Sequence, residues 1–313
     1  MELILETLAP LALLIALGSV LAHIKFLGET FIADLNKLAF WVALPAMIFT
    51  SASNEIGAVG QVWMIFFVLA GATLLISFIA WTASYALRLP GTARGTLVQS
   101  SFRGNLAYIG IPVLTNSLAL TAPANAKEIL TTVVIVMVLT TAFYNILAVI
   151  VLQASQRSTS QGTLLATLRS IATNPLMLAG LLGLAVPLLH LRLPFIVQSA
   201  LQSLGAAAVP LALLCIGGSL VLVPMRGKLL WIIAAAVMKT AALPSLVFLL
   251  TRLAGFDPVA QRIALVYSAC PTAAASYVMA RQMGGDEALA SGSIALSTIL
   301  SALGLAAALW LTS

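Results

Sequence analysis

Ten long apolar runs, separated by short polar stretches, constrain the fold of this chain more than any other feature. Each run is on the order of 20 residues, the length that a helix needs to cross a bilayer. Only 8% of the 313 residues are charged and 61% are hydrophobic, whereas a soluble domain has roughly 25% charged residues. The sequence therefore excludes a single water-soluble domain and predicts an all-α polytopic membrane protein with ten transmembrane helices. The predicted spans are 7–27, 36–53, 61–86, 95–118, 128–152, 173–190, 195–223, 228–251, 259–281 and 288–312.

The distribution of Lys and Arg in the connecting loops predicts how the chain is oriented in the membrane. One side collects nine cations and the other four, and the side with the excess is expected to face the cytoplasm. Both termini are therefore predicted to lie outside the cytoplasm, in a multi-pass protein of the inner (plasma) membrane. The larger group is Lys25, Lys37, Arg88, Arg94, Arg157, Arg169, Arg226, Lys228 and Arg281, and the smaller is Lys127, Arg192, Arg252 and Arg262.

The longest polar connection, residues 153–172, divides the chain into two halves of five predicted helices, 1–152 and 173–313. Because five is odd, two homologous halves would face opposite ways in the membrane, which is the inverted-repeat plan of many secondary transporters. We therefore expect two inverted five-helix repeats joined by a cytoplasmic linker. Matching residues in the fourth and ninth spans support this interpretation and pair Arg94 with Arg262, Leu97 with Leu265, Val98 with Val266 and Ser100 with Ser268.

The fourth span contains residues that interrupt a helix near its middle. Its sequence SFRGNLAYIGIPVL includes Gly104 and Pro112; proline removes a backbone hydrogen bond, and glycine lowers the cost of unwinding. Inside a bilayer, freed backbone groups are tolerated only within protein or along a polar cavity. An ordinary proline kink is one interpretation, but Arg103 and Asn105 beside the interruption favour a binding site.

The ninth span has a similar interruption. Pro271 lies in its middle, within YSACPTAAASYVMA, and Thr272 and Ser276 follow it. Interrupted segments at corresponding places of two halves are the best sequence indication of a transporter's substrate site. We therefore predict that residues of both interruptions, including Pro271, Thr272 and Ser276, contribute to substrate binding.

Charges within the predicted spans indicate the charge of the substrate. Arg103 and Lys239 lie within spans, and a buried unpaired charge costs about 2.5 to 3.5 kcal/mol on insertion scales. Because no carboxylate is available there, a bound anion is the natural partner of Arg103, whose planar fork can grip a carboxylate through two hydrogen bonds. All nine carboxylates lie in loops or at span ends: Glu2, Glu6, Glu29, Asp34, Glu55, Glu128, Asp257, Asp286 and Glu287.

Three other intramembrane features each allow two interpretations. In one interpretation, Lys239 extends to the interface or bonds backbone carbonyls of a broken helix. In the other, it is a second anion contact or a coupling residue. Asn145 either lines a cavity or makes an interhelical hydrogen bond. The Gly217–Ser219 stretch either permits close helix packing, which we favour, or contacts substrate.

Three motifs resemble the auxin efflux carrier family. They are Asn-x-x-x-x-Gly-Ile-Pro from Asn105 to Pro112, Val-Ala-Leu-Pro-x-x-x-Phe from Val42 to Phe49, and Asn-Pro-Leu from Asn174 to Leu176. The resemblance covers essentially the whole chain, in order. The family includes plant PIN carriers and bacterial carriers of malonate and other small organic acids.

The resemblance implies a bile-acid-symporter-like and NhaA-like fold, in which broken fourth and ninth helices cross at mid-membrane. It also implies that a transport domain moves against a scaffold domain, and that Asn105 and the backbone around Pro112 contact the substrate carboxylate. This sequence departs from the plant members at Ser276, which replaces a second proline, at the apolar Ile48, and in the short loop 153–172. These departures argue against auxin itself as the substrate.

We expect a secondary carrier of small organic anions, such as malonate and other carboxylates, that works by elevator-type alternating access in the lipid bilayer. A sensor that binds the same anions, a sodium-coupled symporter of the bile-acid-carrier type, and a channel are the alternatives. An enzyme is not expected, because the sequence has no His-Glu-x-x-His, Gly-x-Ser-x-Gly or paired intramembrane Asp. No cofactor, metal or nucleic acid is expected to bind, while proton or sodium coupling and a homodimer stay open.

Overall fold

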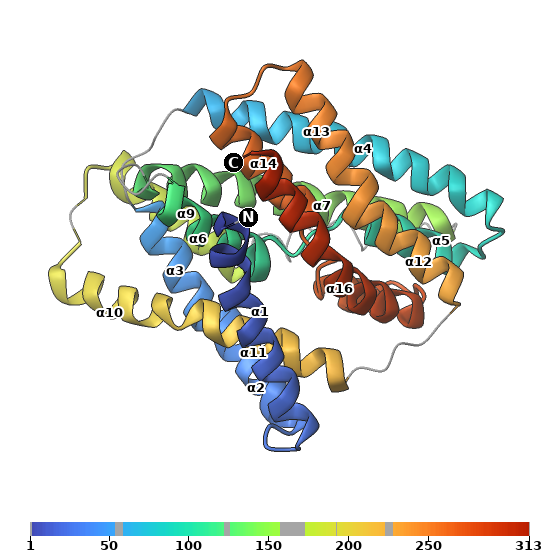
Figure 1. The fold of residues 1–313 in the computed structure, drawn as a ribbon, viewed down its shortest axis with the longest axis horizontal. Coiled ribbons are helices and arrows are strands. Elements are labelled where there is room, and N and C mark those ends of the chain that lie inside the picture. Colours follow the sequence, from blue (N-terminus) through green and yellow to red (C-terminus); the bar gives the residue numbers. More distant parts are fainter. Residues whose placement is uncertain are drawn as a thin grey trace. The chain divides into compact units, whose positions relative to one another are not determined.

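The computed structural model describes residues 2–53, 59–121, 126–156, 173–191, 193–222 and 228–312, and the regular structure in these ranges is helical (Figure 1). Three single π-helical turns interrupt the α-helices: η1 (Ala39–Ala43), η2 (Leu106–Gly110) and η3 (Met238–Ala242). The α-helices are α1 (Glu2–His23), α2 (Glu29–Leu38), α3 (Leu44–Ala52), α4 (Val59–Ala86), α5 (Gly91–Phe102), α6 (Ile111–Thr121), α7 (Ala126–Gln156), α9 (Pro175–Leu188), α10 (Phe195–Ala206), α11 (Ala208–Leu222), α12 (Leu229–Val237), α13 (Leu243–Leu253), α14 (Pro258–Ala269), α15 (Ala275–Gln282) and α16 (Glu287–Leu311).

Every predicted span coincides with a helix or with consecutive helical segments. Within the described ranges, seven stretches are long and apolar enough to cross a membrane, and Leu106–Thr121 and Pro175–Leu188 are shorter apolar helices. The predicted span 259–281 is formed by α14 and α15, on either side of an interruption. The chain is therefore an all-helical multi-span membrane protein with about seven to nine crossing helices. Ten crossings stay a prediction.

Some sequence predictions fall on residues outside the described ranges. The linker 153–172 is described only as far as Gln156, the last residue of α7. Four of the cations used for orientation, Arg157, Arg169, Arg192 and Arg226, also lie outside these ranges. The placement of both termini outside the cytoplasm therefore stays a prediction.

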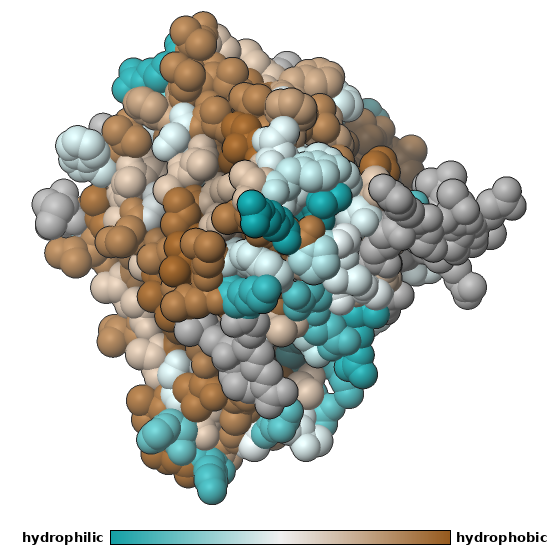
Figure 2. Space-filling view, turned by 90° about the vertical axis from the view of Figure 1, so that its right-hand side faces the viewer, coloured by the Kyte–Doolittle hydropathy of each residue, from teal (hydrophilic) through white to brown (hydrophobic). Residues whose placement is uncertain are grey.

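Large apolar side chains cover much of the molecular surface. Figure 2 shows broad hydrophobic areas on the face that it presents. Phe195 and Ile196 of α10 are 82% and 81% exposed, and Leu303 of α16 is 74% exposed. Water disfavours so much exposed apolar surface, whereas the hydrocarbon of a bilayer does not. The surface is therefore that of a protein surrounded by lipid.

Each of the three π-helical turns ends two residues before a proline. Pro45 follows η1, Pro112 follows η2 and Pro244 follows η3. Proline has no backbone N–H to donate, and its ring crowds the carbonyl four residues earlier. We attribute the wider turns to these prolines, which interrupt the α-helical hydrogen bonding without ending the helical segment. Such π turns are frequent at functional sites.

Contacts divide the chain into two compact units. Unit 1 consists of Met1–Trp63, Ala107–Leu139 and Ser170–Val223, and unit 2 consists of Met64–Leu106, Thr140–Arg169 and Pro224–Ser313. Each unit takes residues from both sequence halves, so the units differ from the predicted repeats. The division into repeats at 1–152 and 173–313 stays a prediction.

In unit 1, α1 and α11 pack with their backbones in close contact (Figure 1). A Cβ atom at Gly18 would overlap the carbonyl oxygen of Leu214, and one at Gly217 would overlap that of Ile15. Ser19 Oγ donates a hydrogen bond to the Gly217 carbonyl at 2.9 Å. Small residues are what allow membrane helices to approach so closely. Gly217 therefore serves helix packing, as we favoured from the sequence.

Gly217→Ala is expected to destabilise unit 1, because its methyl group would force α11 away from α1. Overpacking of this kind costs about 1 to 3 kcal/mol, which thermal unfolding in detergent would detect as a lower midpoint. Gly71→Ala in α4 is the control, because its Cβ would meet nothing within 4 Å. Equal midpoints for the two variants would contradict the packing assignment.

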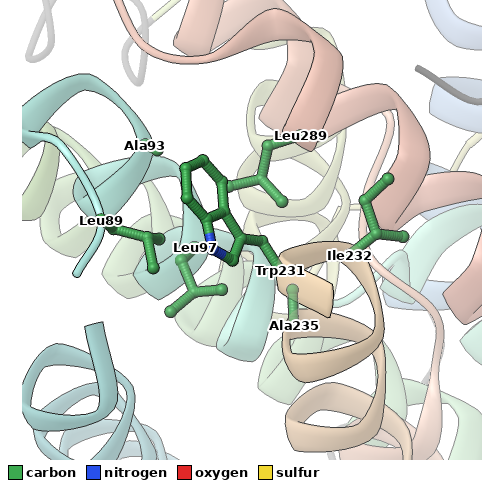
Figure 3. Packing of buried hydrophobic residues seen from close by; sticks show 7 residues of the cluster. All are labelled: Leu89, Ala93, Leu97, Trp231, Ile232, Ala235 and Leu289. Carbon is green, nitrogen blue, oxygen red and sulfur yellow. The ribbon is translucent and has the colours of Figure 1, made fainter. Parts of the chain in front are cut away.

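In unit 2, a buried apolar cluster joins α5, α12 and α16. Trp231 of α12 lies among Leu89, Leu97 and Leu289 (Figure 3). Burial of side chains of this size contributes about 1.5 to 3 kcal/mol each. The cluster holds the N-terminal half of α5 in place, and its remaining members are Ala93, Ile232 and Ala235.

Candidate functional site

In unit 2, α5 and α14 are each followed by a short extended segment. α5 ends at Phe102, and Arg103 has extended backbone angles (φ −71°, ψ 97°). α14 ends at Ala269, residues 270–274 follow, and the chain becomes helical again in α15. The sequence predicted interruptions at these two places, and the structure has both.

The two extended segments pair with each other in the antiparallel sense. The Asn105 N–H donates to the Pro271 carbonyl at 2.8 Å, and the Ala273 N–H donates to the Arg103 carbonyl at 2.9 Å. Gly104 lies opposite Thr272 in this isolated β-bridge. Backbone groups that leave a helix inside a membrane protein need such partners. We call residues 103–105 and 270–274 the paired breaks.

Gly104 lies in a tight space between the paired breaks and their neighbours. A Cβ atom there would lie 3.0 Å from Cδ2 of Leu106, 3.3 Å from the Tyr267 carbonyl oxygen and 3.5 Å from Cε of Lys239. The first two distances are shorter than ordinary van der Waals contact. A larger residue at position 104 would thus need its neighbours to move by a few tenths of an ångström.

Arg103 is buried, with 7% of its surface exposed, and its guanidinium contacts two neutral side chains. One nitrogen donates to Oδ1 of Asn145 on α7, and the other donates to Sδ of Met279 on α15. The structure therefore brings together Arg103 and Asn145, both of which the sequence singled out. Asn145 thus links α7 to the first of the two extended segments.

From Gly95 to Phe102, every residue of α5 is buried, although several of the side chains are polar. Gln99 donates through Nε2 to the Ser276 carbonyl at 2.9 Å, and Thr272 donates through Oγ1 to the Ser100 carbonyl at 2.9 Å. Gln99 Oε1 and Ser276 Oγ are buried and have no hydrogen-bond partner among the described residues. A buried polar atom without a partner is costly, so these atoms are available to a bound water or ligand.

Lys239 lies on η3 and its side chain is fully buried. Its ammonium donates a hydrogen bond to the backbone carbonyl of Ser268, in the last turn of α14. This is the contact with a broken helix that one interpretation of the sequence described. Lys239 therefore directs its charge towards the backbone at the C-terminal end of α14, which the second paired break follows.

Pro112 does not belong to the group of residues that unit 2 brings together. It is the second residue of α6, which lies in unit 1. Asn105 contributes its backbone N–H to the paired breaks. Arg103, Gly104, Asn105, Asn145, Lys239, Pro271, Thr272 and Ser276 all belong to unit 2.

Sequence reasoning missed three residues of this region. They are Gln99, Met279, and Ser297, whose Oγ accepts a hydrogen bond from the Thr272 N–H at 3.0 Å. Gln99 stands four residues before Arg103, one helical turn away, and that spacing was a signal that could have identified it. Ser and Met are common in membrane helices, so nothing distinguishes Ser297 or Met279 in the sequence.

Comparison with known proteins assigns the family. A sequence model of the family described as "Membrane transport protein" matches residues 3–310, nearly the whole chain. The chain belongs to this family, the auxin efflux carriers. It is a membrane transporter rather than an enzyme, and a transported small solute follows from that family.

Two relatives of this carrier extend over most of its length. A protein of Rhizobium meliloti (strain 1021) named "Putative malonate transporter" is 27% identical over 276 residues, covering 85% of this chain and 82% of the relative. A protein of Methanocaldococcus jannaschii named as an uncharacterized transporter is 23% identical over 282 residues, covering 88% of this chain and 87% of the relative. The carrier is thus similar to these two relatives over more than four fifths of its length.

Proposed function

We propose that the protein is a secondary transporter of small carboxylates and that the substrate binds to Arg103 beside the paired breaks. The observation that carries this proposal is the environment of the Arg103 guanidinium, which is buried against Asn145 and Met279. Both partners are neutral, and within the described ranges the one ion pair joins Lys37 to Asp34. The positive charge of Arg103 is therefore available to an anion.

Electrostatics favours a carboxylate in this position. Arginine stays charged at neutral pH, and its planar group can form two parallel hydrogen bonds to one carboxylate. Burying the charge without a counter-ion is costly, and a bound anion offsets that cost. α15 begins directly after the second paired break, and the N-terminal end of a helix adds partial positive charge.

Malonate is our first candidate among the carboxylates. Its support is the name of the Rhizobium meliloti relative, which shares 27% identity with this chain. Lys239 is directed at the Ser268 carbonyl, so we assign one guanidinium, rather than two cations, to the substrate. Monocarboxylates of similar size are therefore included in the proposal.

The hydrogen bonds of the paired breaks support inverted repeats. The sequence alignment of Arg94 with Arg262 is a shift of 168 residues, and the same shift takes Gly104 to its bridge partner Thr272. The same shift takes Arg103 to Pro271 and Asn105 to Ala273. The hydrogen bond from Asn105 to Pro271 therefore corresponds to the one from Ala273 to Arg103. A pseudo-two-fold axis through the Gly104–Thr272 bridge accounts for this correspondence.

We further propose that unit 2 is the part that moves during transport and that unit 1 is the scaffold. Both paired breaks and all of the hydrogen bonds described for Arg103, Lys239 and Thr272 lie within unit 2. Movement of unit 2 as one body leaves these contacts intact. An elevator-type exchange of access is the movement that fits this arrangement.

Counterflow in proteoliposomes tests the proposed function. Purified protein would be reconstituted with unlabelled malonate inside, and labelled malonate, acetate, lactate and succinate would be offered outside in turn. We expect saturable, protein-dependent exchange of at least one of these anions and none of labelled alanine or glucose. If no carboxylate exchanges while the protein is folded and inserted, the proposed function is wrong.

Asn145→Asp is expected to reduce exchange strongly without unfolding the protein. The substitution keeps the shape of the side chain but places a carboxylate within reach of the Arg103 guanidinium, where it competes with the substrate anion. Such a buried pair is strongly coupled, so we expect a loss of at least about tenfold in counterflow. Asn36→Asp in α2 is the matched control and is expected to retain exchange. Undiminished exchange by Asn145→Asp would contradict the assigned substrate contact.

A further inference from the structure

The side chain of Lys239 lies beside the C-terminal end of α14 and beside Gly104 of the first paired break. η3, which carries it, packs against α5, α14 and α16. The ammonium donates to the Ser268 carbonyl, while Cε lies 3.5 Å from the position of a Cβ on Gly104. The charge is therefore placed at the C-terminal end of α14, next to the extended residue Gly104.

The carbonyl that accepts this hydrogen bond has a counterpart in α5. The shift of 168 residues pairs Ser100 with Ser268 and Gly104 with Thr272. The Ser100 carbonyl accepts a hydrogen bond from Oγ1 of Thr272 at 2.9 Å. Gly104 has no hydroxyl to offer Ser268, and the Lys239 ammonium bonds to that carbonyl instead. The Ser100 carbonyl near the end of α5 thus accepts from a neutral hydroxyl, whereas the Ser268 carbonyl near the end of α14 accepts from a charged ammonium.

The surroundings of the ammonium resemble those of a bound alkali cation. The C-terminal end of a helix carries about half a negative charge, and in transporters with interrupted helices such ends and extended carbonyls coordinate Na⁺. Within the described ranges, the one ion pair is between Lys37 and Asp34, so no carboxylate described there neutralises Lys239. The backbone at the end of α14 is its acceptor.

We propose that Lys239 is a built-in cation that occupies the position of a coupling ion at the end of α14, so that transport needs neither Na⁺ nor K⁺. This inference rests on the proposed function for its transport readout. It also predicts a new site: removal of the side chain leaves a space beside the Ser268 carbonyl that accepts a small monovalent cation. Na⁺ and methylammonium are the two probes, because each matches the charge and approximate size of the lost group.

The wild-type protein provides the first test. Counterflow of labelled carboxylate would be measured in proteoliposomes with NaCl, KCl or choline chloride on both sides. We expect equal rates within about twofold, since no site for an alkali ion is coupled to exchange. Stimulation by Na⁺ or K⁺ beyond this range would overturn the inference, whether or not any variant folds.

Lys239→Ala provides the second test. In choline chloride its exchange is expected to fall by at least about tenfold and to recover in part when NaCl or methylammonium chloride is added. Lys239→Met fills the space without a charge and is expected to recover with neither salt. Full activity of Lys239→Ala in choline, or a folded variant that neither cation restores, would contradict the built-in cation.

Thermal unfolding in detergent separates this inference from the proposed function. Na⁺ and methylammonium are expected to raise the unfolding midpoint of Lys239→Ala, because a ligand that binds the folded state stabilises it. The same salts are expected to leave the wild type and the exposed-site control Lys228→Ala unchanged. The unfolding midpoint can be measured without any transport. If the protein exchanged no carboxylate, the proposed function would be refuted, but the midpoints would still decide the role of Lys239.

Discussion

Arg103→Gln is expected to reduce carboxylate counterflow by at least about a hundredfold, because truncating one partner of a buried charge pair costs roughly 2 to 5 kcal/mol. Glutamine retains hydrogen-bonding groups for Asn145 and Met279 but carries no charge for the substrate. Counterflow rates at several substrate concentrations would show whether the loss lies in binding. We expect the apparent KM to increase by a larger factor than the maximal rate decreases.

Two further substitutions sharpen this experiment. Arg103→Lys keeps the charge but not the planar fork, and it is expected to give an intermediate rate. Arg252→Gln is the matched control, because Arg252 is exposed and lies over the Phe248 ring, 5.2 Å from its centroid. Its exchange is expected to be unchanged. A folded Arg103→Gln variant that exchanges carboxylates at the wild-type rate would refute the assignment of the substrate charge.

Ala273→Pro is expected to cause the second large loss. The substitution removes the N–H that donates to the Arg103 carbonyl at 2.9 Å, one of the two backbone hydrogen bonds of the paired breaks. A buried carbonyl without its donor costs about 1 to 3 kcal/mol, and the shift of Arg103 that follows displaces its guanidinium. We expect counterflow to fall by at least about tenfold.

Ala274→Pro is the matched control for this prediction. Ala274 is exposed and has φ −55°, an angle that proline adopts, at the N-terminal end of α15. Proline is well tolerated at such positions, so folding and exchange are expected to be retained. Thermal unfolding of both variants distinguishes loss of the pairing from global unfolding. Equal exchange by the two variants would show that the paired breaks do not need this hydrogen bond.

The interruptions of the fourth and ninth spans could be predicted from the sequence because Gly104 and Pro271 act locally. Each changes the backbone at its own position, whatever the rest of the chain does. The grouping of Arg103 with Asn145 was partly predictable, since polar side chains within membrane spans seek one another. Their direct hydrogen bond depends on how α7 packs, and no pattern in the sequence shows that.

Other features required the structure because they depend on register between distant segments. The bond from Lys239 to the Ser268 carbonyl and the bond from Thr272 to the Ser100 carbonyl both end on backbone atoms, which leave no trace in side-chain identity. Met279 and Ser297 are ordinary residues of membrane helices. Pro112 lies in α6 of unit 1, and its contact with the substrate stays a prediction.

A structure determined with malonate bound would show whether Arg103 holds the substrate. We predict density for the anion within hydrogen-bond distance of the Arg103 guanidinium, beside the paired breaks and with at least one carboxylate oxygen facing its nitrogens. We also predict that the Lys239 ammonium still contacts the Ser268 carbonyl in that structure. Malonate bound elsewhere in the protein, with Arg103 contacting only Asn145 and Met279, would show that Arg103 is not the substrate contact.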